Sequence, residues 1–339
     1  MNYIEILGLL FIFYILLNKF LISKKIFLDP KQSLKHKSFL NQSKDVPFSG
    51  GILILIACLF FFSIELILFK VFLIIVFLIG FLSDLEILKR PIKRIIFQSF
   101  TIGIFLFIND SFINSVRIEF FDSFLEIYYF KLIFTLFCLL ILINGSNFMD
   151  GINTLTTTYY IMVILSILYL EQKYNFESEI NILMISLLSL TIVFIFNLFG
   201  KVYLGDSGSY LIAFLVGVIL INFSNANIMI SPYFVACMLW YPAYENLFSI
   251  IRKKIKNISP SKPDNKHLHQ LLYLQFKRIL KFGSNTTNSI TGILINTYNF
   301  LVFMFAINNY SNTKILILIL IINVIIYTTL YSILKKNYK

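Results

Sequence analysis

Apolar runs recur along the whole length of this chain, and each is long enough to cross the roughly 30 Å hydrocarbon layer of a bilayer as a helix of about 17–25 residues. The composition agrees with a lipid environment, because 58% of the residues are hydrophobic and only 14% are charged. Soluble domains carry about 25% charged residues. A transmembrane β-barrel would instead show alternating polarity. The sequence therefore predicts an all-α integral membrane protein in which residues 1–339 form a single polytopic domain.

Eleven runs qualify as candidate transmembrane helices, so we expect 10–11 spans, at approximately 4–22, 50–69, 71–88, 94–109, 130–146, 155–170, 181–199, 208–223, 228–251, 289–308 and 314–334. The second and third are separated by little more than Lys70. Together they run nearly twice the length of one crossing, so a tight hairpin is preferred over one long helix. The first run lacks a basic segment before it and a small-residue cleavage site after it, and is predicted to be a retained span.

Lysine and arginine collect after the odd-numbered spans, in the segments 24–44, 89–94 and 252–281. The segments after the fourth and sixth spans are mostly acidic. The positive-inside rule then places the N-terminus outside and the C-terminus in the cytoplasm, with 252–288 as a long basic cytoplasmic loop. This topology and the attraction to anionic membrane lipids account for the formal net charge of +12, so no nucleic-acid partner is expected.

Five polar clusters interrupt the apolar pattern, and all five fall on the cytoplasmic side of this topology. The first runs from Asp29 through His36 to Gly50-Gly51, whose glycines permit close approach to a ligand or a neighbouring helix. Taken alone, this cluster is better explained as a basic juxtamembrane loop with helix-packing glycines.

The second cluster is Ser83-Asp84, followed by Lys93 and Gln98 at the start of the next span. A carboxylate at the end of an apolar helix is costly unless it has a partner or a function. Asp84 therefore either pairs with Lys89 or Arg90 or takes part in chemistry.

The third cluster, Asn144–Asn153, packs side-chain amides and carboxylates directly after an apolar run. Asn144, Asn147 and Asp150 recur every three residues, so in a helical turn they share a face. That face offers the hard oxygen ligands that Mg²⁺ accepts. A loop cap uses one or two such residues, so this cluster is predicted to be functional.

The fourth cluster is Asn197 followed by Gly205-Asp206-Ser207-Gly208-Ser209 at the start of a span. These residues are either an ordinary helix N-cap or a carboxylate that holds a cation bridging phosphates.

The fifth cluster lies in the long basic loop, from Arg252 to Gln270. No third soft ligand accompanies His267 and His269, so zinc is not expected. Hydrogen-bond donation to a pyrophosphate from the loop's basic side chains is the preferred interpretation, with Arg252, Lys266, His267 and His269 as donors.

Taken in this order, the five clusters resemble the polyprenyl-phosphate N-acetylhexosamine-1-phosphate transferases, the superfamily of WecA and MraY. The resemblance covers positions 28 to about 270 and is strongest at Asn144–Asn153, at Gly205–Ser209 and at the stretch from Pro263-Asp264 to His267-Leu268-His269. That last stretch is more similar to the WecA branch than to MraY, whose loop usually has three consecutive histidines.

The resemblance implies a role for each matching position. Asp206 and Asn147 match positions that hold the catalytic Mg²⁺, and Asp150 matches an essential acidic position near the nucleotide. Asp84 matches the second member of an aspartate pair implicated in acceptor activation. Phosphate contacts are implied for Lys93, His267 and His269.

Four positions depart from the family pattern. Ser83 stands where the first aspartate of the pair is usual, Asn153 where many relatives have aspartate, Gln270 where a final histidine is common, and Glu245 where aspartate often precedes the basic loop. The Ser83 change puts in doubt any mechanism that needs both carboxylates. Because Asp84, Asp150 and Asp206 persist, an active but divergent branch is expected over an inactive homologue.

The expected function is the transfer of a sugar-1-phosphate from a UDP-N-acetylhexosamine to undecaprenyl phosphate or another polyprenyl phosphate at the bacterial cytoplasmic membrane. UMP is released, Mg²⁺ is the cofactor with Mn²⁺ as its alternative, and a lipid-linked surface glycan is started. The expected catalytic residues are Asp84, Asp150 and Asp206. The expected substrate-binding residues are Lys93, Asn144, Asn197, Arg252, His267 and His269. The expected metal ligands are Asn147 and Asp206. The competing class is a membrane transporter. A homodimer, the donor sugar, the glycan pathway and the choice between direct attack and an aspartyl-phosphate route are left open.

Overall fold

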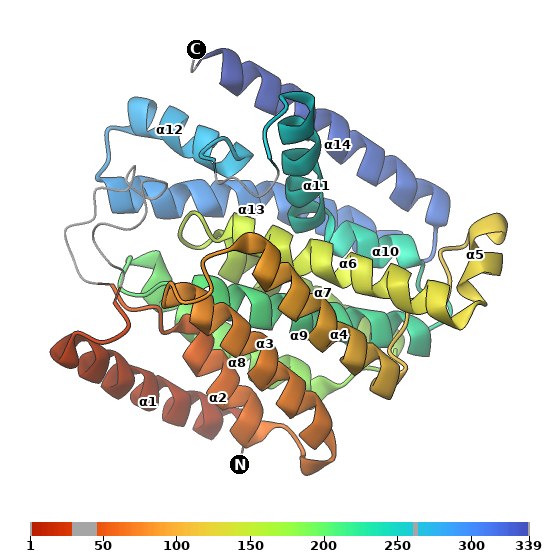
Figure 1. Ribbon diagram of the computed structural model, residues 1–339, viewed down its shortest axis with the longest axis horizontal. Helices are drawn as coiled ribbons and strands as arrows, with labels where there is room; N and C mark the ends of the chain where they lie inside the picture. Colours follow the sequence, from red (N-terminus) through yellow and green to blue (C-terminus); the bar gives the residue numbers. More distant parts are fainter. Residues whose placement is uncertain (1, 29–45, 260–263, 338–339) are drawn as a thin grey trace.

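The computed structural model describes residues 2–28, 46–259 and 264–337, and in these ranges the chain is almost entirely helical (Figure 1). No strand occurs there apart from an isolated bridge between Leu28 and Pro47. The first cluster's residues from Asp29 to Asp45, and Pro260 to Pro263 of the fifth, lie outside the described ranges. The helices are α1 (Tyr3–Lys24), α2 (Gly50–Phe61), α3 (Ile67–Asp84), α4 (Pro91–Asn109), α5 (Glu119–Leu125), α6 (Tyr128–Met149), α7 (Leu155–Tyr174), α8 (Ile180–Leu198), α9 (Gly205–Ala226), α10 (Pro232–Met238), α11 (Trp240–Ile255), α12 (Leu268–Leu280), α13 (Ser284–Asn308) and α14 (Thr313–Lys336), with a short 3₁₀ helix at Ile64–Leu66.

Every predicted span coincides with one or two of these helices, which confirms the all-α membrane class. Within the described ranges, eight helices are long and apolar enough to cross a bilayer, and α2 is a shorter apolar helix. The ninth predicted span is broken at Leu239 into α10 and α11, and the short helices α5 and α12 were not predicted. The count of eleven crossings therefore stays a prediction.

The structure has the predicted hairpin between α2 and α3, but its turn lies earlier in the chain than predicted. The turn lies at Phe62–Leu66, and Lys70 is inside α3. The buried Lys70 Nζ donates to the carbonyl oxygens of Leu59 at 3.0 Å and Phe62 at 2.8 Å. These are carbonyls at the end of α2 that have no partner in their own helix, so the lysine is a helix cap rather than the turn itself.

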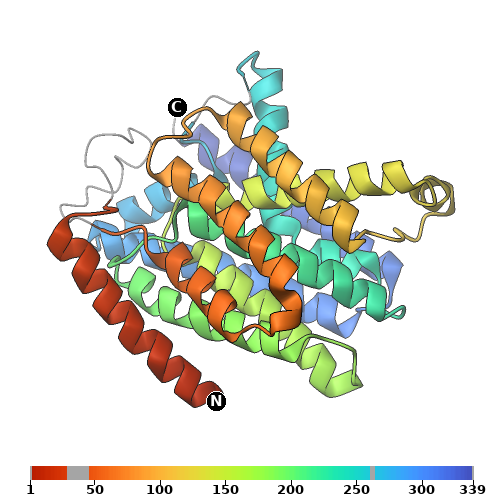
Figure 2. The ribbon, with the colours of Figure 1, turned by 60° about the horizontal axis from the view of Figure 1, so that its bottom comes forward.

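Helix α9 lies at the centre of the bundle and packs against α2, α3 and α6. Its sequence is apolar around its whole circumference, as expected of a helix with no lipid-facing or water-facing side. Helices α1 and α4 instead expose large apolar side chains such as Ile4, Phe100 and Phe107, which suits contact with lipid. Figure 2 shows α1 at the edge of the bundle.

The start of α9 approaches its neighbours closely because two glycines lie opposite it. A Cβ on Gly51 of α2 would lie 2.5 Å from the backbone nitrogen of Gly208, and one on Gly80 of α3 would overlap the backbone at Asp206 and Ser207. The backbone N–H groups of Gly50 and Gly51 also donate to the carbonyls of Tyr203 and Leu204. The paired glycines of the first cluster are thus helix-packing residues.

Replacing Gly80 with alanine should displace the start of α9, because the added methyl group meets backbone that has no rotamer to change. We expect Gly80→Ala to destabilise the protein by about 1–3 kcal/mol, the usual cost of overpacking. Gly103→Ala on α4, which meets no atom within 4 Å, is the matched control and should be neutral or slightly stabilising. Thermal denaturation in detergent measures both, and equal stability of the two variants would refute this packing.

Candidate active site

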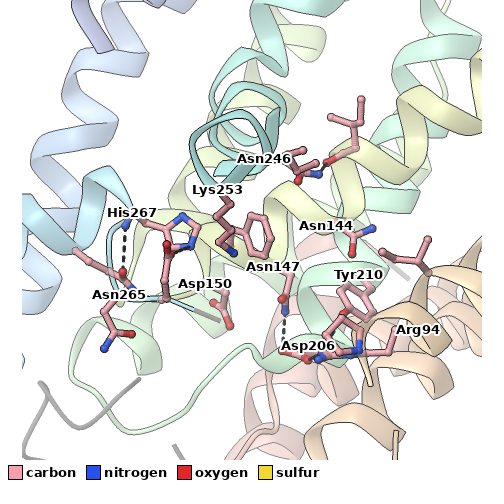
Figure 3. Close-up of a pocket in the computed structure, with 18 of the residues that line it drawn as sticks. Arg94, Asn144, Asn147, Asp150, Asp206, Tyr210, Asn246, Lys253, Asn265 and His267 are labelled. Carbon is pink, nitrogen blue, oxygen red and sulfur yellow. Dashed lines mark hydrogen bonds and ion pairs between the residues drawn. The ribbon is translucent and has the colours of Figure 1, made fainter. Parts of the chain in front are cut away.

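A cavity of about 690 Å³ opens where several helix ends meet (Figure 3). Its lining comes from the first turns of α4, the end of α6, the start of α9, the second half of α11 and the segment that leads into α12. Five of the expected site residues line it: Asn144, Asn147, Asp150, Asp206 and His267. The third, fourth and fifth clusters therefore converge on one space, and helix ends supply their side chains.

Asp206 is the most heavily bonded carboxylate of the cavity. Its Oδ1 accepts a hydrogen bond from Asn147 Nδ2 at 2.6 Å. Its Oδ2 accepts from Ser83 Oγ at 2.6 Å and from Arg94 Nη1 at 2.8 Å. The Arg94 Nη1 also donates to Ser83 Oγ at 2.7 Å, so Ser83, Arg94 and Asp206 form one connected group.

Asp84 lies behind this group and caps α9. Its Oδ1 accepts from the backbone N–H of Asp206 at 2.8 Å, and its Oδ2 accepts from the N–H and the hydroxyl of Ser207 at 3.0 and 2.7 Å. The first N–H groups of a helix have no partner within the helix and attract negative charge, so this carboxylate from α3 does the work of an N-cap. Gly205 has φ of +77° and lies directly against Asp84, where a Cβ would sit 2.8 Å from its Oδ2.

Asp150 follows the end of α6, and in the view of Figure 3 it lies between the Asp206 side and the His267 side of the cavity. Its Oδ2 accepts from the backbone N–H of Gly205 at 3.2 Å. The loop that carries Asp150 is therefore tied to the loop that carries Asp206. Asn144, two turns before Asp150 on α6, donates to the buried Gln98 Oε1 at 3.0 Å.

His267 is oriented by the carboxylate of Glu245, which in the sequence marks only a departure from the family pattern. Glu245, which is 1% exposed, accepts at Oε1 from His267 Nδ1 at 2.7 Å and at Oε2 from the Tyr327 hydroxyl at 2.8 Å. This contact fixes the orientation of the ring through Nδ1. The other ring nitrogen, Nε2, lies 3.5 Å from Asp264 Oδ1. Such second-layer carboxylates hold the orientation of functional histidines.

Four of the expected binding residues do not line the cavity. Lys93 is exposed, and helix α4 presents its neighbour Arg94 to the cavity instead. His269 is fully buried and stacks behind His267, with 5.5 Å between the ring centroids. Asn197 is buried as well; its Oδ1 accepts from the Thr154 N–H at 2.6 Å and its Nδ2 donates to the Val202 carbonyl at 2.9 Å. It joins the loops that follow α6 and α8, which is a positioning role.

Arg252 is the fourth residue that does not line the cavity. Its Nη2 forms an ion pair with Asp264 Oδ2 at 2.9 Å, and its Nη1 donates to the Lys266 carbonyl at 2.6 Å and to the Tyr331 hydroxyl at 2.9 Å. The side chain holds the segment before α12 against α11 and α14. Its neighbour Lys253 lines the cavity in its place.

The sequence reasoning missed Arg94, Tyr210, Asn246 and Lys253, all of which line the cavity. Arg94 and Lys253 were noted only as topology signals, since each lies in a basic run. Tyr210 follows Asp206 by four positions, or one helical turn, and this helical periodicity was the signal available for it. Nothing in the sequence alone distinguished Asn246.

A divalent cation fits this donor set only with help from a ligand. Within the described residues there is no group of three or more His, Cys, Asp or Glu side chains placed to hold a metal. Mg²⁺, however, is commonly bound by one or two carboxylates together with waters and substrate phosphates. Asp206 offers one carboxylate, and Asn147 offers an amide whose oxygen and nitrogen can exchange places by a flip of the group.

The helices and the cavity together define a polytopic membrane protein with a polar site at the helix ends. Residues 66–224 match the family model described as Glycosyl transferase family 4. The match contains Asp84, Asn144, Asn147, Asp150 and Asp206 but ends before His267. It supports, at the level of the family, a transferase that moves a sugar phosphate to a polyprenyl phosphate. A comparison with curated proteins gave no match.

Acid should destabilise the fold through His269. Burial lowers the pKa of its imidazole to about 4, whereas an exposed histidine has a pKa of about 6.5. The folded protein thus binds fewer protons than the unfolded chain between these values, so stability is retained above about pH 6.5 and is lost as the pH falls toward 4, by up to about 3 kcal/mol.

Thermal denaturation in detergent at about pH 7 and about pH 5 measures this loss. The non-titrating variant His269→Phe keeps a planar ring behind His267, and its melting temperature should fall less on acidification than that of the wild type. An equal fall in both proteins would mean that His269 does not carry the acid sensitivity.

Proposed function

We propose that this protein transfers a sugar-1-phosphate, from a UDP-N-acetylhexosamine, to a polyprenyl phosphate such as undecaprenyl phosphate and releases UMP. The observation that carries the proposal is the convergence of Asn147, Asp150, Asp206 and His267 on one cavity, with Asp206 and Asn147 in direct contact. The first three lie in the segment that matches the family. The cavity is also large enough for part of a nucleotide sugar, since ligand sites commonly occupy about 300–1,000 Å³.

Asp206 and Asn147 are the residues that would hold Mg²⁺, or Mn²⁺ in its place. When bound there, the ion would neutralise negative charge on the pyrophosphate during transfer. The protein's own contribution is to fix these two side chains before substrate arrives. Asp84 does so for Asp206 by capping the helix that carries it, and preorganised charge of this kind is usually the largest part of catalysis.

Side chains that can donate hydrogen bonds lie on both sides of Asp150 and are the proposed phosphate ligands. His267 and Lys253 come from the α11–α12 side, and Arg94 comes from α4. Arg94 takes the role that the resemblance gives to Lys93, since only Arg94 lines the cavity. A guanidinium can donate two hydrogen bonds to phosphate in a fixed geometry, so Arg94 can bind phosphate in place of a lysine.

Asp150 is the favoured group for orienting the acceptor. Both oxygens of Asp84 already accept hydrogen bonds from the start of α9, whereas Asp150 lines the cavity. In direct attack, an oxygen of the lipid phosphate forms a bond to the β-phosphorus of the UDP-sugar while the bond to the bridging oxygen breaks and UMP leaves. The lipid phosphate is already largely ionised near pH 7, because the second pKa of a phosphate monoester is about 6. Positioning therefore contributes more than proton abstraction. Trapping an aspartyl-phosphate adduct would decide for the rival double displacement.

The lipid substrate suits a site at the ends of membrane helices. The cavity is lined by the apolar side chains of Ile92, Ile95, Phe137, Leu140 and Ile250 as well as by its polar groups. The basic segments after α3 and α11 lie at the same helix ends as the cavity, which under the positive-inside rule supports a site that faces the cytoplasm. The proposed location is a bacterial inner membrane. The product would begin a lipid-linked surface glycan such as O-antigen, capsule or teichoic acid.

A transporter is disfavoured by where the ionisable groups lie. Glu65 is exposed in the turn between α2 and α3. Lys70 caps α2, and the charged groups of the cavity come from helix ends. Transporter sites instead lie near the bilayer midplane.

UMP release by the purified full-length protein tests the proposal. With UDP-N-acetylglucosamine or UDP-N-acetylgalactosamine, polyprenyl phosphate and Mg²⁺, the wild type should release UMP. Chelation of the metal should abolish release. Asp206→Asn should lower the rate by about 100-fold or more, as removal of a preorganised electrostatic group does.

Asp110→Asn is the matched control, because it makes the same chemical change at an exposed residue after α4, far along the helix from the cavity. It should retain the wild-type rate. An absence of UMP release across several UDP-sugars, or full activity of Asp206→Asn, would refute the proposal.

A further inference from the structure

A second cavity, of about 410 Å³, lies between α11 and α14, and no step of the proposed reaction uses it. Figure 1 shows the C-terminal part of α14 beside α11. Phe248 of α11 packs against Tyr331 of α14, with 4.8 Å between the ring centroids, and these two rings form part of the wall.

Four cations line this second cavity: Arg252, Lys256, Lys335 and Lys336. No carboxylate is among the described residues that line it. Asp264 neutralises part of the Arg252 charge from the other side, but none of the three lysines forms an ion pair with any residue of the described ranges. Burial and the neighbouring cations of Lys335, Lys266 and Arg252 lower the pKa of the Lys256 ammonium.

Arg252 adds to the three lysines a donor whose orientation is fixed by other contacts. The side chain is 7% exposed, and its orientation is set by the contacts of Nη1 and Nη2 described above. Its buried Nε has no hydrogen-bond partner among the described residues.

The cavity is also apolar on one side, which distinguishes a lipid from a small anion. Ile251 and Ile255 line it and are 54% and 78% exposed, so they continue the apolar surface of α11 outward. A phosphate group with attached acyl chains would satisfy both the cations and these isoleucines. Basic pockets between membrane helices are known to accept anionic head groups in this way.

We propose that the cavity between α11 and α14 binds the phosphate head group of an anionic phospholipid, with Arg252, Lys256, Lys335 and Lys336 around the phosphate and Ile251 and Ile255 against the acyl chains. Because Arg252 also contacts Asp264, the bound lipid holds the segment that carries His267 in place. The binding itself does not depend on the proposed enzymatic function.

The test measures lipid binding to the full-length protein in detergent by native mass spectrometry. We expect one phosphatidylglycerol per chain to bind about tenfold or more tighter than phosphatidylcholine with the same acyl chains. The triple variant Lys256→Gln/Lys335→Gln/Lys336→Gln should lose this preference. The control variant Lys24→Gln/Lys25→Gln/Lys89→Gln removes the same charge elsewhere and should keep it.

A second variant separates the site from charge alone. Ser332→Trp fills the cavity from α14 and retains all four cations, and it should also weaken phosphatidylglycerol binding. Melting temperatures without added lipid identify any variant that fails to fold. Equal binding of the two lipids, unchanged binding in both the triple variant and Ser332→Trp, or displacement of the lipid by an equal concentration of inorganic phosphate would overturn the proposal.

Discussion

The contact between the Asp84 carboxylate and the start of α9 is the interaction on which the rest of the site depends. It brings the end of one membrane helix to the beginning of another and satisfies N–H groups that have no partner within α9. The same contact sets the direction of Asp206, since its backbone nitrogen is one of the donors. Gly51 and Gly80 make the close approach of the helices sterically feasible. Asp150 accepts a hydrogen bond from the N–H of Gly205, the residue before Asp206.

Ser83 has a physical explanation in this arrangement. The resemblance raises a doubt about a chain that lacks the first aspartate of the pair. In the structure Ser83 donates to Asp206, and Arg94 contacts both. An aspartate at position 83 would place a second carboxylate against Asp206 and require a further cation; a serine requires none, because its hydroxyl can donate. Ser83 is thus compatible with an intact Asp206 site. The charge of Asp206 is balanced by Arg94, and no carboxylate pair between positions 83 and 206 is needed.

Much of the fold could be predicted from the sequence, because apolar runs report membrane helices with little ambiguity. Breaks inside apolar stretches were harder. Lys70 marked the α2–α3 hairpin only approximately, since a long lysine side chain reaches back to cap a helix that ended well before it. The break at Leu239 between α10 and α11 comes just before Pro242, which has no N–H to donate to the Met238 carbonyl; that carbonyl accepts from the Tyr159 hydroxyl instead. Three of the polar clusters supply side chains to the cavity, yet the sequence could not tell which of two nearby residues lines it: Arg94 or Lys93, Lys253 or Arg252, His267 or His269. Those choices depend on helix rotation and on Glu245, which lies more than twenty positions before His267.

The most direct test of the central contact is a double-mutant cycle between Asp84→Asn and Ser207→Ala, read as the free energy of unfolding in mixed detergent micelles. The contact predicts that the two changes are not additive, with a coupling of about 1 kcal/mol or more, as is usual for hydrogen-bonded neighbours. Additive effects, with no coupling between these two side chains, would contradict the account.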